Sequence, residues 1–264
     1  SLTSFVKRRY LMIFPWYDSH WHSAYQAVFG FLQTEYPTRV DDFVNALLPL
    51  HTRKDFKPII AHDILSTATL SEANAVIAGI GIGDWEVHEV ESFGRLVLHD
   101  HPYFSDLQQR LTEQVSDMVN EEVVPSYSFL SIYNGRGVCE PHLDNPVAKW
   151  TLDIPLDASA VWPIYISSVS EWPTEDACTE DWQSSIKSSF SFDAFELASG
   201  SGLVFSGSSQ WHYRNPAPIE PNFYNHLIFF HYVPTAMQGL VDPLAWSDYF
   251  GIAEIGEIIR VFQE

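Results

Sequence analysis

Hydrophobic patterning divides this chain of 264 residues into two differently built halves. In residues 19–36 and 105–123 the apolar side chains fall on one helical face. The clearer of these two stripes consists of Leu107, Leu111, Val115 and Met118. A capping box of Ser105 and Gln108 is expected to begin that helix. From residue 126 onward the apolar runs are short and are separated by Gly, Pro, Asn and Ser, which is typical of β-strands.

The order of helices and strands limits the fold class. The strand-like runs are residues 126–134, 150–156, 161–167, 202–207 and 226–234. Helices that come first and strands that follow without regular alternation argue against a parallel β/α fold. They favour an α+β domain with a β-sandwich or barrel near its C-terminus. The polar, acidic run at residues 167–189 is expected to be a long surface loop.

The chain contains no internal repeat and no linker that would separate two domains. We therefore predict a single domain over residues 1–264. Its predicted parts are a mainly helical segment at 1–103, a sheet-rich core at 104–234 and a C-terminal helical segment at 235–264.

Composition excludes several classes of partner. Lys and Arg number 14 against 34 Asp and Glu, so the formal net charge is -20 and a nucleic-acid partner is not expected. The longest apolar stretch, residues 75–82, is too short to cross a bilayer.

The cysteines argue against a disulfide scaffold and against a zinc site. Cys139 and Cys178 are too few for such a scaffold, and the chain has no Cys-x-x-Cys pair that could bind zinc. Pro15 and Asp18 interrupt the apolar run near the start, which argues against a signal peptide. We expect a cytoplasmic protein with no membrane partner, and its oligomeric state is left open.

Three residues are candidate metal ligands. In GVCEPHLDNP, residues 137–146, His142 and Asp144 are two apart, so on a strand their side chains point the same way. His212 follows another strand-like run far downstream. Two imidazoles and one carboxylate can occupy one face of an octahedral ion and leave positions open, which suits non-haem Fe(II). The alternative is a turn histidine beside a solvated aspartate, with His212 packed against Trp211.

Other histidine pairs are weaker candidates. His99 and His101 lack the glutamate that a cupin motif carries three or four residues later. His20 and His22 lie on a predicted helix, where residues two apart do not face each other.

The order of these segments resembles the prolyl-4-hydroxylase-like family of 2-oxoglutarate/Fe(II)-dependent dioxygenases. In SYSFLSIYNGRGVCEPHLD, a strand ending in Tyr133 leads through a Gly-x-Gly turn to Pro-His-x-Asp. ASGSGLVFSGSSQWHYRNP resembles the strand and turn that deliver the distal histidine. The resemblance covers roughly residues 104–234. It implies a double-stranded β-helix (a jelly roll, cupin-like) with N-terminal helices packed on it. It also implies His142, Asp144 and His212 as metal ligands.

The resemblance implies an activity and its cofactors. These are Fe(II), 2-oxoglutarate and O₂ as cosubstrate, in an oxidoreductase that hydroxylates an unactivated C–H bond of a small-molecule substrate. Asp144 argues against halogenation, because related halogenases lack the carboxylate ligand. Tyr133, nine residues before His142, matches the family tyrosine that contacts 2-oxoglutarate. The unmatched N-terminal hundred residues and the segment 168–190 are expected to shape the pocket.

The chain departs from the family pattern beyond the distal histidine. The family carries a Lys or Arg about ten residues further on, but residues 218–227 here read PIEPNFYNHL. An unpaired buried carboxylate is unfavourable, so 2-oxoglutarate would need another cation. Arg214 is the first choice, since it lies two residues past His212 on the same strand face and can grip a carboxylate with two hydrogen bonds. Arg136 is the second choice for this cation and Lys149 the third.

Further possibilities remain open at this point. His226 and His231 have opposite parity on one strand, so without a bulge at most one faces the interior. The missing downstream cation also leaves room for an iron oxygenase that does not use 2-oxoglutarate. A non-catalytic jelly-roll binding protein is the remaining alternative.

Overall fold

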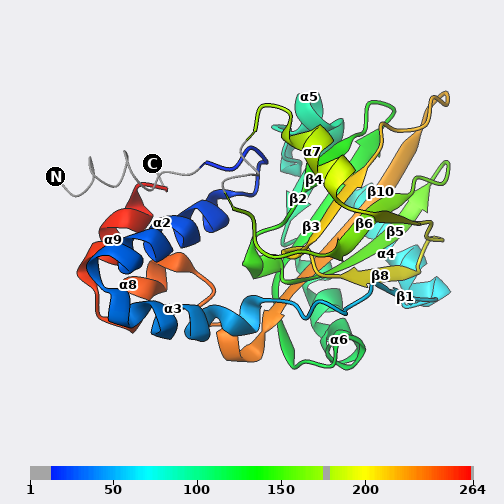
Figure 1. The fold of residues 1–264 in the computed structure, drawn as a ribbon. Helices are drawn as coiled ribbons and strands as arrows, with labels where there is room; N and C mark the ends of the chain where they lie inside the picture. Colours follow the sequence, from blue (N-terminus) through cyan, green and yellow to red (C-terminus); the bar gives the residue numbers. More distant parts are fainter. Residues whose placement is uncertain (1–12, 175–178, 263–264) are drawn as a thin grey trace.

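The strands of the protein form two antiparallel sheets, seen on the right of Figure 1 in a computed structural model that describes residues 13–174 and 179–262. The six-stranded sheet has the order β1-β8-β5-β10-β3-β2, and the four-stranded sheet has the order β4-β9-β6-β7. The strands are β1 (Ile59–Ala61), β2 (Arg95–His99), β3 (Val123–Asn134), β4 (Cys139–His142), β5 (Trp150–Ala158), β6 (Ile164–Val169), β7 (Phe192–Phe195), β8 (Gly202–Phe205), β9 (Gln210–Arg214) and β10 (Tyr224–Pro234).

Helices cover the larger sheet and build a separate cluster beside it (Figure 1). They are α2 (His20–Glu35), α3 (Val40–Leu47), α4 (Thr67–Gly79), α5 (Val90–Phe93), α6 (Pro102–Val119), α7 (Trp182–Ser189), α8 (Trp246–Phe250) and α9 (Ala253–Arg260). Helix α6 packs on β3 and buries Leu107, Leu111 and Val115, which confirms the predicted apolar face. Within the described ranges, no helix is both long and apolar enough to cross a membrane.

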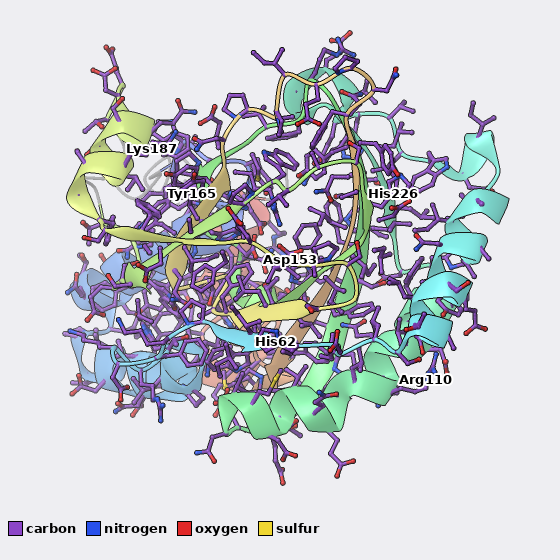
Figure 2. All side chains as sticks on the ribbon, turned by 90° about the vertical axis from the view of Figure 1, so that its right-hand side faces the viewer. His62, Arg110, Asp153, Tyr165, Lys187 and His226 are labelled. Carbon is purple, nitrogen blue, oxygen red and sulfur yellow. The ribbon has the colours of Figure 1, made fainter. Side chains whose placement is uncertain are left out.

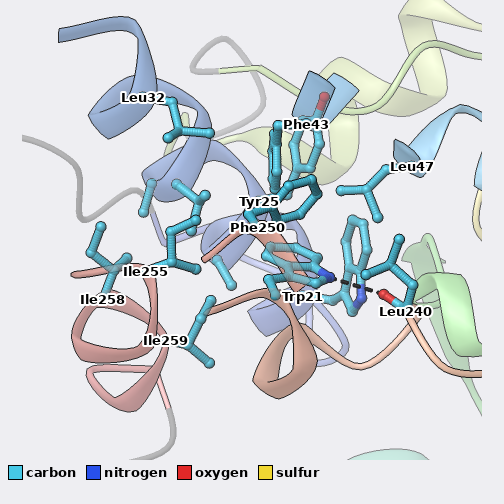
Figure 3. Close-up of a cluster of buried hydrophobic side chains, with 14 of the residues drawn as sticks. Trp21, Tyr25, Leu32, Phe43, Leu47, Leu240, Phe250, Ile255, Ile258 and Ile259 are labelled. Carbon is cyan, nitrogen blue, oxygen red and sulfur yellow. Dashed lines mark hydrogen bonds between the residues drawn. The ribbon is translucent and has the colours of Figure 1, made fainter. Parts of the chain in front are cut away.

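The helices near the two ends of the chain pack on one another. Helices α2 and α3 share a buried cluster with α8 and α9, drawn in Figure 3. The indole rings of Trp21 and Trp246 meet edge-on at its centre, with their centroids 5.3 Å apart. Val233 of β10 belongs to the same cluster, so the helical unit adjoins the larger sheet. Helices α2 and α9 therefore depend on each other for burial.

Some sequence predictions are confirmed and others are wrong. The five predicted strands are present as β3, β5, β6, β8 and β10, and the helix predicted at 19–36 is α2. The capping box at Ser105 is wrong, because α6 begins earlier with Pro102 in its first turn and His101 as its cap. The loop predicted at 167–189 contains α7, and Cys178 lies outside the described residues. Residues 1–103 also supply strands β1 and β2 to the larger sheet.

The space between the two sheets is only partly filled by apolar side chains. Ile164 and Ile166 of the smaller sheet pack against Leu203 and Phe205 of the larger sheet. Ile164 and Phe205 also line a cavity of about 280 Å³. The space between the two sheets therefore contains both an apolar core and this cavity.

One buried histidine lies at the base of the helical cluster. His22 of α2 is 1% exposed, and neither of its ring nitrogens makes a hydrogen bond of good geometry to a described residue, although the backbone of Asp144 is near enough to oppose the lowering of its pKa. The rings of Trp16, Trp21 and Trp172 surround it. Burial lowers the pKa of His22 from 6.5 to about 4. The folded protein therefore keeps this ring neutral where the unfolded chain would protonate it.

Replacing His22 with Leu should reduce the loss in free energy of unfolding that occurs as the pH falls below 7. Because the pKa is lower in the folded state, the His22 contribution is complete above pH 6.5 and is lost as the pH falls toward 4. The loss over that window is about 3 kcal/mol. Urea unfolding at pH 7 and pH 4 measures this loss, and the free energy of unfolding of the variant should fall by about 3 kcal/mol less than that of the wild type. His20→Leu, at an exposed site on the same helix, is the control and should follow the wild type. Parallel losses in wild type and His22→Leu would contradict the prediction.

Candidate metal centre

The strand pairing of the smaller sheet brings the three predicted ligands together. His142 at the end of β4 is paired in register with His212 of β9. Asp144 follows two residues later, and its backbone N–H donates to the Gly207 carbonyl over 2.9 Å. The Oδ1 atom of Asp144 lies 3.5 Å from Nε2 of His142 and 3.7 Å from Nε2 of His212. One ligand atom from each residue lies within 4.8 Å of the others, and all three residues are buried.

Backbone carbonyls fix which nitrogen of each ring faces the centre. Nδ1 of His142 lies 2.8 Å from the Glu140 carbonyl, and Nδ1 of His212 lies 2.9 Å from the Gln210 carbonyl. A carbonyl only accepts, so each Nδ1 carries the hydrogen and donates it. Each Nε2 is then left with a lone pair within 3.7 Å of Oδ1 of Asp144, and the Tyr17 hydroxyl donates to that of His142 over 2.8 Å. An Nε2 lone pair is what a metal-binding histidine offers.

The electrostatics of Asp144 and His212 suit a divalent cation, whereas at His142, although burial opposes it, Cys139 and Asp144 raise the pKa of the ring well above its usual value. Although burial opposes it, the nearby rings of His212 and His142 hold the pKa of Asp144 below its usual value. Burial, reinforced by His142, lowers the pKa of His212 to about 3. A carboxylate and a neutral imidazole are the protonation states that bind metal. Two nitrogens and one hard oxygen on one side of a chamber fit Fe(II) with open positions.

The three side chains line the cavity between the sheets. Tyr133 and Arg214, both singled out from the sequence, line it as well. His231 of β10 lies on its wall, with Nδ1 3.1 Å from Oγ1 of Thr151, whereas His226 does not line it. The expectation that at most one of these two histidines faces the interior is confirmed.

Arg214 already has partners inside the protein. Its guanidinium donates to Oδ2 of Asp153 over 2.6 Å and to the Trp162 carbonyl. Asp153 is completely buried, and Figure 2 shows it in the interior of the molecule, whereas Arg110 lies on the outer helix α6. Oδ1 of Asp153 has no partner among the described residues. Arg214 therefore faces the cavity as half of an ion pair.

The other two cations named from the sequence lie away from the cavity. Arg136 is exposed in the turn between β3 and β4. Lys149 is buried, and its Nζ donates to the carboxylate of Glu121 and to the Pro49 carbonyl. Neither residue lines the cavity.

Sequence reasoning missed a second arginine at the cavity. Arg95 of β2 stands opposite Tyr133 of β3, and its Nη1 donates to the Tyr133 hydroxyl over 2.6 Å. It is 4% exposed, pairs with Glu89 and lies over the ring of Phe129. Burial raises the pKa of Tyr133, while Arg95 and Arg214 both oppose this rise. The two guanidinium groups therefore share Tyr133 as a neighbour. An arginine at the start of the apolar run RLVLH was the available signal, but that strand was not predicted.

Residues near the start of the described chain also reach the centre. The Tyr17 hydroxyl lies 2.8 Å from Nε2 of His142. The Asp18 carboxylate accepts hydrogen bonds from the backbone N–H and side-chain amide of Asn145, over 2.8 and 2.9 Å. Burial and the neighbouring Asp144 raise the pKa of Asp18 to about 7. No local pattern in the sequence marks Tyr17 or Asp18 as cavity residues.

The two segments expected to shape the pocket differ in outcome. The N-terminal hundred residues contribute Tyr17, Asp18, Glu89 and Arg95 to the cavity wall. For the segment 168–190 the prediction was wrong, because none of its described residues lines the cavity. Instead α7 packs behind β4.

Comparison with known proteins finds likeness in structure only. No protein-family model matches the chain, and no curated protein matches it. HygX from Streptomyces hygroscopicus, solved with nickel and 2-oxoglutarate bound, is similar with a TM-score of 0.51 and 14% identity, over 67% of this chain and 83% of HygX. AviO1 from Streptomyces viridochromogenes Tue57 gives 0.51 and 15%, over 73% and 95% of the two chains. SnoN, a non-heme alpha ketoglutarate dependent epimerase from nogalamycin biosynthesis, gives 0.51 and 10%, over 78% and 90%.

The chain shares the fold of these proteins. HygX was solved with 2-oxoglutarate bound, and SnoN is described as alpha ketoglutarate dependent. This is the cosubstrate that the family resemblance implied. Fold alone does not assign an activity, so the residues of the centre have to carry that argument.

A glycine makes room for the Asp144 carboxylate. A Cβ at Gly207 would lie 2.3 Å from Oδ2 of Asp144 and 2.7 Å from Oγ1 of Thr151. No real structure tolerates such contacts, so Gly207→Ala should push the carboxylate away from the two histidines. We expect Mn(II) binding by the purified protein, measured by calorimetry, to weaken about tenfold or more. Gly239→Ala is the matched control, since a Cβ there meets nothing within 4 Å. A folded Gly207→Ala protein with wild-type affinity would refute this account of the glycine.

Proposed function

We propose that the protein is a non-haem Fe(II)- and 2-oxoglutarate-dependent dioxygenase with His142, Asp144 and His212 as its metal ligands. The observation that carries the proposal is the convergence of two oriented imidazoles and one carboxylate, all three buried, on the wall of a cavity. The likeness to HygX and SnoN supports the choice of cosubstrate. On this proposal the two antiparallel sheets are the two faces of a double-stranded β-helix of the prolyl-4-hydroxylase-like kind.

Each part of the centre has a defined task on this proposal. Fe(II), with 2-oxoglutarate and O₂, would supply the oxidation of an unactivated C–H bond. His142, Asp144 and His212 would hold the ion from one side and leave its other positions open. The carbonyls of Glu140 and Gln210 keep both histidines in the binding tautomer.

Arg95, Tyr133 and Arg214 form the anchor that we propose for 2-oxoglutarate. Both guanidinium groups line the cavity and act on the tyrosine between them. Each arginine has a carboxylate partner, Glu89 or Asp153, which balances its charge in the interior. A guanidinium has five N–H donors, so donors remain for a carboxylate of the cosubstrate. Arg95 thus joins Arg214, the cation favoured from the sequence.

The substrate that we propose is a small molecule. The cavity of about 280 Å³ lies between the sheets and has Tyr127, Phe129 and Phe229 on its walls. Apolar and aromatic walls with a few polar groups are typical of small-molecule sites. Hydroxylation is the outcome that we propose. SnoN is described as an epimerase, so other outcomes occur on this fold.

A second candidate is an iron oxygenase that does not use 2-oxoglutarate. The observation that favours it is the pairing of both cavity arginines, Arg95 with Glu89 and Arg214 with Asp153. A paired guanidinium attracts an anion less strongly than a free one does.

One experiment separates these functions. Fe(II) and then 2-oxoglutarate are added anaerobically to the protein, and the weak visible charge-transfer band of the chelate is recorded. We expect the band in the wild type, its absence in His142→Ala, and succinate formation once air is admitted. Iron binding without the band or succinate would favour the second candidate. If the protein binds no stoichiometric iron, a non-catalytic binding protein is the remaining explanation.

Removing either cavity arginine should weaken 2-oxoglutarate binding. Each charge-assisted bond contributes about 1.5–3 kcal/mol, so Arg95→Gln and Arg214→Gln should each raise the Kd about tenfold or more. The anaerobic titration measures this Kd, and Fe(II) affinity should stay unchanged. Arg110→Gln, which removes an exposed arginine on α6, is the control and should titrate as the wild type.

The Arg214 variant requires a partner substitution. Without Arg214, the buried Asp153 carboxylate would lose its cation, and breaking such a pair costs roughly 3–5 kcal/mol of stability. Combining Arg214→Gln with Asp153→Asn removes both charges and isolates the effect on the cosubstrate. If neither this variant nor Arg95→Gln changes the Kd, the anchor is wrong.

A further inference from the structure

A short segment that the sequence analysis left without a role contacts one predicted ligand and the chain neighbours of the other two. Residues 14–18, here called the N-terminal strap, precede helix α2. Tyr17 contacts His142 itself through its hydroxyl. Asp18 holds Asn145, the residue after Asp144. The ring of Trp16 meets Trp211, the residue before His212, edge-on at 4.9 Å.

The strap is fixed at several points along its length. The Ser19 hydroxyl donates to the Phe14 carbonyl over 2.8 Å and ties the strap to the start of α2. Phe14 and Trp16 belong to a buried cluster with Leu143 and Trp211. Leu143 lies between the ligands His142 and Asp144, so the strap packs directly on the ligand loop.

Asp18 has the most specific contact with that loop. One carboxylate oxygen accepts the backbone N–H of Asn145 and the other accepts its side-chain amide. The remaining side-chain oxygen of Asn145 accepts the Val147 N–H and caps the next turn, Pro146–Ala148. The Asp144 N–H is held separately by the Gly207 carbonyl. The backbone N–H of Asp144 and that of the next residue are therefore both anchored, the first by Gly207 in the turn between β8 and β9 and the second by the strap.

We propose that Asp18 is a positioning residue of the metal centre, which orients Asp144 through its two hydrogen bonds to Asn145. The inference rests on the proposed function, because it assumes that Asp144 binds the metal. Asp18 lies outside the set of ligand atoms that converge on one point. Its effect is therefore exerted through the loop.

The competing explanation is that Asp18 acts only through its charge. A carboxylate beside the centre would attract a cation whether or not it held Asn145. The two explanations differ for a variant that keeps the Asp18 charge and removes a bond to it. Asn145→Ser is such a variant, since a serine hydroxyl can still cap Val147 but is one bond shorter than the amide that donates to Asp18.

The test is a Mn(II) titration followed by the electron paramagnetic resonance signal of the free ion. Asp18→Asn should raise the Kd about tenfold, in the range found for residues that orient metal ligands. Asn145→Ser should raise it by a smaller factor. The double variant should bind no more weakly than Asp18→Asn alone, because residues that act through one contact are not additive. Asp193→Asn, at an exposed carboxylate on β7, should bind as the wild type.

Three results would overturn the inference. These are wild-type affinity in Asp18→Asn, wild-type affinity in Asn145→Ser, or a double variant whose effect is the product of the two single effects. If Asp18→Asn does not fold, the Asn145→Ser result decides alone. Asp144→Ala distinguishes failure of the proposed function, since a wild type that binds Mn(II) no better than this variant has no such metal centre.

Discussion

The register between β4 and β9 is the constraint on which the rest of the centre depends. His142 and His212 are direct partners across these antiparallel strands, so their side chains leave the same face of the sheet side by side. A shift of one residue would turn one ring to the opposite face. The carbonyls that fix the tautomers come from the same two strands, at Glu140 and Gln210. Strand pairing thus sets both the position and the orientation of the two imidazoles.

The cavity is lined by buried charged side chains, and each has a partner that balances its charge. Arg95 is matched by Glu89 and Arg214 by Asp153, while Asp144 faces two imidazoles. Replacing buried ion pairs by apolar residues is often neutral or stabilising, so their presence is weak evidence for a purely structural role. Donors held in fixed positions around Tyr133 are instead what a site for an anionic ligand requires. Two buried arginine–carboxylate pairs and the three predicted ligands are therefore concentrated around one cavity.

The sequence predicted those parts of the centre that are encoded locally. His142 and Asp144 are two apart, and the strand-like runs around them and before His212 were visible as apolar patterns. Arg95 was missed because its role depends on pairing with Tyr133 across a strand of only five residues. Asp18 was missed because its partner Asn145 is 127 positions away. The error at Ser105 had a local cause, since Pro102 satisfies the first turn of α6 one turn earlier.

The helical cluster beside the sheets supports the cavity indirectly, although none of its buried side chains lines the cavity. Helix α2 begins directly after the N-terminal strap, and Ser19 ties the two together. That helix is buried against α8 and α9, and Trp21 of α2 also donates to the Val241 carbonyl over 2.7 Å. The C-terminal helices therefore hold α2, α2 holds the strap, and the strap holds the loop that carries Asp144. A short isolated helix such as α2 is marginal in water, so this chain of support requires tertiary packing at each step.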